Sequence, residues 1–99
     1  MAVNGLPFIL ERGCGLDVHK DTVVATIKGS DFETQTKTFL TFTDDLYSLV
    51  EWLQEHHITD VVMESTGVYW RPVYAILEDY FRVIVVNARH GLIFYWITL

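Results

Sequence analysis

The stretch Gly13–Asp21 reads GCGLDVHKD, and the stretch Val61–Gly67 reads VVMESTG. Each is a short apolar run that ends on a carboxylate, Asp17 or Glu64, and then passes into residues typical of turns. The apolar residues predict a strand, and a strand's end is where a side chain can leave the core. If the two strands are neighbours, the carboxylates lie close together and repel each other unless a cation lies between them.

The rest of the chain supplies the other elements of one small α/β domain. We predict the element order β-β-β-α-β-α-β. Three strands joined by short turns form an antiparallel meander, and two strands that follow helices run parallel to the first, which gives a five-stranded mixed sheet. The predicted strands are Cys14–Val18, Val23–Ile27, Thr34–Leu40, Val61–Glu64 and Arg82–Val86.

Two helices are predicted from their first residues and their apolar stripes. We expect the Thr43 hydroxyl to cap the first helix, which ends near residues 55–57, and residues 65–67 to cap the second. The residues that face the sheet are predicted to be Leu46, Leu49, Val50 and Leu53 in the first helix and Val73, Ile76, Leu77 and Tyr80 in the second.

Composition narrows the choice of function and location. The chain has 99 residues and a net charge of −6, with only seven Lys and Arg residues, which do not cluster. Because phosphate contacts come from basic residues, a simple nucleic-acid binder is disfavoured. The single cysteine favours a cytoplasmic protein, and residues 92–99 are apolar but too few to span a membrane.

Asp17 and Glu64 are the candidate metal ligands and catalytic residues. Carboxylate oxygens on adjacent strand ends can bind Mg²⁺ or Mn²⁺ and leave coordination sites for phosphate and water. The alternative is that Asp17 caps a turn and Glu64 is a solvated strand end. A zinc site at His56–His57 is disfavoured because no third ligand lies at suitable spacing, and Cys14 is interpreted as a small buried hydrophobe.

Residues near these carboxylates are candidates for contact with nucleic acid. Tyr69 or Trp70 could stack on a base or sugar, although such aromatics are more often part of a core or an interface. Lys20, in the turn after Asp17, could reach a phosphate, or could be a solvated turn residue. Thr66 and Arg89 complete this set of candidates.

Three blocks resemble a known family: GLDVHK at residues 15–20, MESTGVYW at residues 63–70 and VVNARH at residues 85–90. They are similar to the amino-terminal domain of the DEDD-type insertion-sequence transposases of the IS110 group, relatives of the Piv site-specific invertase. The resemblance implies a ribonuclease H-like (RuvC-like) domain in which an Asp-Glu-Asp-Asp set holds Mg²⁺, with Asp17 and Glu64 as its first two members. It also implies DNA element ends as substrate, a guide RNA in some members, a homo-oligomer and a bacterial or archaeal cytoplasm.

The sequence departs from the family pattern after residue 90. Family members continue through a basic segment to two further aspartates and then to a domain with a serine nucleophile, whereas here no Asp or Glu follows Asp79. We therefore expect a lead-in at residues 1–12, a partial transposase domain at 13–90 that is incomplete at its C-terminus, and an atypical apolar tail at 91–99. We also expect no strand transfer by this chain alone.

Two other functions compete with a truncated transposase. An actin-like or sugar-kinase-like ATPase also has a hairpin after its first strand, but residues 19–21 lack the Gly, Ser or Thr that cradle phosphate there. A non-catalytic module that pairs with intact transposase and inhibits it is the third possibility.

Overall fold

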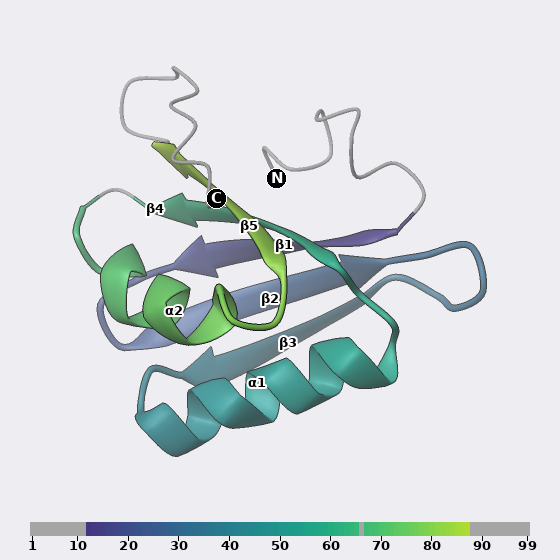
Figure 1. Cartoon of the computed structure of the whole chain (residues 1–99), viewed down its shortest axis with the longest axis horizontal. Coiled ribbons are helices and arrows are strands. Elements are labelled where there is room, and N and C mark those ends of the chain that lie inside the picture. The colour runs from purple at the N-terminus through teal and green to yellow at the C-terminus, as the bar shows by residue number, and fades with distance from the viewer. Residues whose placement is uncertain (1–11, 66, 88–99) are drawn as a thin grey trace.

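The computed structural model describes residues 12–65 and 67–87, which fold as a five-stranded mixed sheet with two helices (Figure 1). The strands lie in the order β3-β2-β1-β4-β5. Strands β1, β2 and β3 pair antiparallel, and β4 pairs parallel with both β1 and β5. The elements are β1 (Gly13–Val18), β2 (Thr22–Lys28), β3 (Gln35–Leu40), α1 (Thr43–Glu55), β4 (Asp60–Ser65), α2 (Trp70–Leu77) and β5 (Arg82–Asn87). The predicted element order and the ribonuclease H-like α/β fold are confirmed.

Both helices lie on the same side of the sheet, and the main core fills the space between them and the strands (Figure 1). Side chains alternate between the two faces of a strand, so every second residue points toward the helices. In β1 these residues are Leu16 and Val18, which are 0% and 2% exposed. Asp17, between them, therefore lies on the face opposite the helices.

The first helix, α1, has the expected extent, but its N-terminal cap differs from the sequence expectation. Its N-cap is Phe42 and no side chain caps it, so the predicted role of the Thr43 hydroxyl is wrong. At the other end His57 adopts φ 57°, and the N–H groups of His57 and Ile58 donate to the carbonyls of Gln54 and Leu53 at 3.0 Å each. This is a Schellman motif, which ends the helix where the sequence predicted.

The second helix begins later than predicted. Its N-cap is Tyr69, again without a side-chain cap, so a cap supplied by Ser65 or Gly67 is wrong. Val73 and Leu77 are buried and Ile76 packs against the core as expected. Tyr80 follows the helix and is 47% exposed, which corrects its predicted place on the inner face.

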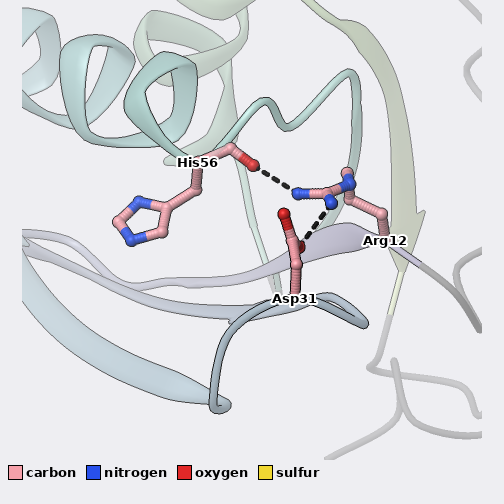
Figure 2. A network of polar contacts seen from close by, with 3 residues as sticks. All are labelled: Arg12, Asp31 and His56. Carbon is pink, nitrogen blue, oxygen red and sulfur yellow. Dashed lines mark hydrogen bonds and ion pairs between the residues drawn. The ribbon is translucent and has the colours of Figure 1, made fainter.

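A polar network ties the start of β1 to the end of α1 and to the turn between β2 and β3 (Figure 2). One Arg12 nitrogen donates to the His56 carbonyl at 2.7 Å, and another forms an ion pair with Asp31. The Arg12 guanidinium also lies 5.4 Å from the centre of the Phe32 ring, and that ring is 5.0 Å from the His56 ring. His56 is therefore a packed residue and more than a solvated helix end.

The predicted segments at the two ends fall mostly beyond the described residues. Of the lead-in at residues 1–12, only Arg12 is described, and the apolar tail at 91–99 lies outside the described range. Within the described residues, no helix is both long enough and apolar enough to cross a lipid bilayer.

Candidate functional site

Asp17 and Glu64 are direct partners in the register between β1 and β4. Neighbouring strands lie about 4.8 Å apart, and partners in a parallel pair project from the same face of the sheet. The sequence predicted that the two carboxylates meet at one edge if these strands are neighbours, and the pairing confirms that arrangement. Both residues stand near the carboxyl ends of parallel strands, where open α/β sheets commonly bind ligands.

The two carboxylates have solvent on one side and an apolar group of side chains on the other. The Asp17 side chain is 44% exposed and Glu64 is half-buried. On the same face, Val62 and Val86 are buried and Ile84 packs against them. Val62 precedes Glu64 by two residues in β4, and Val86 is the partner of Glu64 in β5. An ion held here would have a dry wall beside it and water in front.

His19 adds a third polar group to the pair. Its Nε2 lies 3.3 Å from Oδ1 of Asp17, and its side chain is 60% exposed. The carboxylate can only accept, so a bond between the two groups requires the proton on Nε2. Sequence reasoning missed this contact, although a histidine two residues after a strand-end aspartate was a usable signal.

The donor set fits a hard divalent cation. Among the described residues, no group of three or more His, Cys, Asp or Glu side chains could hold a metal ion. Mg²⁺, however, keeps several waters and is usually bound by one or two carboxylates together with substrate phosphates. Two carboxylates in register meet that requirement, whereas a structural zinc site needs four protein ligands.

The candidate nucleic-acid contacts differ in their surroundings. Lys20 is exposed in the turn after β1, and its carbonyl accepts from the Thr41 hydroxyl at 3.4 Å. Tyr69 is 43% exposed, whereas Trp70 is half-buried against the core, with its ring 5.7 Å from that of Tyr74. Tyr69 is thus the more available of the two rings. Thr66 and Arg89 lie outside the described residues.

The Cys14 thiol and the Ser65 hydroxyl lie near the two carboxylates but are buried away from solvent. The Cys14 side chain is fully buried, and this burial raises the pKa of its thiol, so it is not a nucleophile. The Ser65 hydroxyl is also buried, on the helix side of β4, and has no hydrogen-bond partner among the described residues.

A family model described as a transposase, of the DEDD IS110 type, matches residues 14–91. The chain belongs to this transposase family. The match includes both strand-end carboxylates and the whole described sheet except the first residue of β1. DEDD transposases act on DNA and generally use a divalent metal ion. A search of curated proteins finds no significant match to this sequence.

Proposed function

We propose that this chain carries the metal-binding half-site of an insertion-sequence transposase, in which Asp17 and Glu64 together hold one Mg²⁺ ion, or Mn²⁺ in its place. The observation that supports this best is their pairing in register on neighbouring parallel strands. When bound, such an ion stabilises charge on an attacking or leaving oxygen of a phosphodiester. The DNA substrate would be the ends of the parent element, recognised in some members with a guide RNA.

The charge of the chain supports a cation at this edge. Thirteen Asp and Glu residues oppose seven Lys and Arg residues, so a DNA phosphate approaching the carboxylate pair is repelled. An ion between Asp17 and Glu64 would reverse the local field. Lys20 in the adjacent turn would then add a point charge for a neighbouring phosphate, and Tyr69 would offer a ring to an unpaired base.

Further features of the proposal rest on the sequence and on the family. Thr66, Trp70 and Arg89 are proposed as additional DNA contacts, and the working protein as a cytoplasmic homo-oligomer from a bacterium or archaeon with no membrane association. Because no carboxylate follows Asp79 in this sequence, strand transfer requires acidic groups beyond those present here. The purified chain alone is therefore expected not to cleave or join DNA.

Calorimetric titration of the purified chain with Mn²⁺ tests the half-site. We expect one weak site in the wild-type chain and at least a tenfold loss of affinity in both Asp17→Ala and Glu64→Ala. Asp60→Asn is the matched control, because Asp60 lies on the same strand and face as Glu64 but at the other end, paired with Arg82 at 3.6 Å. This variant should bind Mn²⁺ as the wild type does.

Two results would contradict the proposal. One is a folded wild-type chain that binds no Mn²⁺, which would mean that two carboxylates in register are too few. The other is an equal loss of affinity in Asp60→Asn, which would mean that the titration reports general negative charge and no defined site.

A further inference from the structure

The turn after β1 holds His19 in a fixed place beside Asp17. The His19 N–H donates to the Thr22 carbonyl at 2.9 Å, which closes the turn between β1 and β2. The Thr41 N–H donates to the Asp21 carbonyl at 3.2 Å, and this bond fastens the turn to the end of β3. The turn that carries His19 is thus bonded to the start of β2 and to the residue that follows β3.

The contact between the imidazole and Asp17 joins groups that are close in sequence but on different elements. Asp17 is the fifth residue of β1, and His19 is the first residue of the turn. The Nε2–Oδ1 distance of 3.3 Å is that of an ion pair, slightly longer than an ordinary hydrogen bond, and both side chains are about half exposed. A contact of this kind contributes little to folding, and it places the imidazole where it can bias the orientation of the Asp17 carboxylate.

We propose that His19 is a positioning residue that pre-orients the Asp17 carboxylate for the divalent ion it shares with Glu64. The inference rests on the proposed function above. Groups that hydrogen-bond a metal-binding carboxylate set its orientation, and their removal typically weakens metal binding about 10- to 100-fold. Because this pair is half exposed, we expect about a 3- to 10-fold effect.

The two amide variants of His19 separate this role from a purely structural one. The amide nitrogen of Gln reaches as far as Nε2 of histidine, whereas that of Asn reaches only as far as Nδ1. The backbone bond from residue 19 to Thr22 is kept in either variant. His19→Gln should therefore retain Mn²⁺ affinity, and His19→Asn and His19→Ala should lose it to the same extent.

A second readout needs no metal. The ¹³C chemical shift of the Asp17 carboxyl carbon, measured in the metal-free chain, reports the contact directly. It should move in His19→Ala and His19→Asn and stay close to the wild-type value in His19→Gln. Urea unfolding of the same variants should change little.

The outcomes distinguish the inference from the proposed function. Wild-type Mn²⁺ affinity in His19→Ala and His19→Asn would overturn the positioning role and leave the carboxylate site intact. If the ¹³C shift of the Asp17 carboxyl is the same in all three variants as in the wild type, the positioning role is overturned without any metal-binding measurement. A wild-type chain that binds no Mn²⁺ would overturn both claims together.

Discussion

Asp17 and Glu64 face each other across two strands, and like charges directly opposite on a sheet destabilise it. The metal-free chain therefore carries an electrostatic cost at the place where it would bind an ion. Solvent around the two half-exposed side chains screens much of this cost.

Glu64→Gln should therefore stabilise the metal-free chain while removing the ion site. We expect a gain of about 0.5 kcal/mol in the free energy of unfolding, measured by urea denaturation in the presence of a chelator. In excess Mn²⁺ the difference should shrink, because only the wild type gains stability from binding. Asp60→Asn, which removes a carboxylate paired with Arg82, should show no gain, and a loss of stability in Glu64→Gln would contradict this account.

Folding stability should depend on pH through Asp31, and the direction of this dependence follows from its ion pair with Arg12. The Arg12 guanidinium, hydrogen-bonded to it, lowers the pKa of the Asp31 carboxyl below its ordinary value. A group whose pKa is lower in the folded state adds stability above its unfolded pKa of about 3.9 and loses it as the pH falls through the folded value. Asp31→Asn should thus be slightly less stable than wild type at pH 7 and equal to it at low pH.

Urea denaturation at pH 7, 5 and 3 checks this prediction. The difference should be similar at pH 7 and 5 and smaller at pH 3, which lies below the unfolded pKa. Glu33→Gln, in the same exposed turn, is the control and should differ little from wild type at any of these values. A difference for Asp31→Asn that is as large at pH 3 as at pH 7 would mean that the ion pair is not its source.

Among the elements, the turn between β2 and β3 is held by close packing at Gly29. A Cβ at this position would lie 2.5 Å and 2.7 Å from two ring carbons of Phe32. That ring contacts the Arg12 guanidinium and the His56 ring, and so links the turn to the end of α1. Any residue larger than glycine must displace the ring and weaken this link.

Gly29→Ala should cost about 1–3 kcal/mol in the free energy of unfolding, because the ring must leave its place. In a Phe32→Ala background the same substitution should cost much less, since the clash is gone. A double-mutant cycle by urea unfolding measures the coupling. Strictly additive effects would show that the two positions do not meet.

Strand positions were predictable from sequence, while helix starts were not. Runs such as Val23–Ile27 are bounded by turn residues on both sides, and β2 extends only one residue beyond that run at each end. The sequence rule for caps identified Thr43 because a hydroxyl preceded two acidic residues. In the structure Phe42 occupies the cap position, and its own side chain is 70% exposed. Tertiary packing of the apolar stripe sets this helix, so a missing cap does not shift it.

The placement of the two carboxylates could be predicted from strand alternation and sheet topology. Leu16 and Val18 flank Asp17, so a buried face for them places Asp17 on the other one. Spacing does not tell which side chain turns toward a neighbour, and so the contact with His19 was missed. The burial of Trp70 against the core was equally beyond a sequence pattern, because the aromatic run from Tyr69 does not say which ring faces inward.

At the scale of the whole molecule, the sheet face opposite the helices has two unlike halves. Over β2 and β3 it carries hydroxyl groups, including Thr26 and Thr36, whose oxygens lie 3.1 Å apart. Over β4 and β5 it carries the apolar group of Val62, Ile84 and Val86. The carboxylate pair lies between these halves, where a metal ion would be accessible from solvent.

The sheet order also leads us to expect that the two carboxylates come together late in folding. The antiparallel pairs of β1 with β2 and of β2 with β3 join residues close in sequence, and such local pairings form early and fast. The pairing of β1 with β4 must wait until the chain has passed through α1, because it closes a much longer loop. We therefore expect the charged pair to be assembled in the later, non-local step, where repulsion between the two carboxylates opposes the pairing of β1 with β4 and a bound cation would reduce that repulsion.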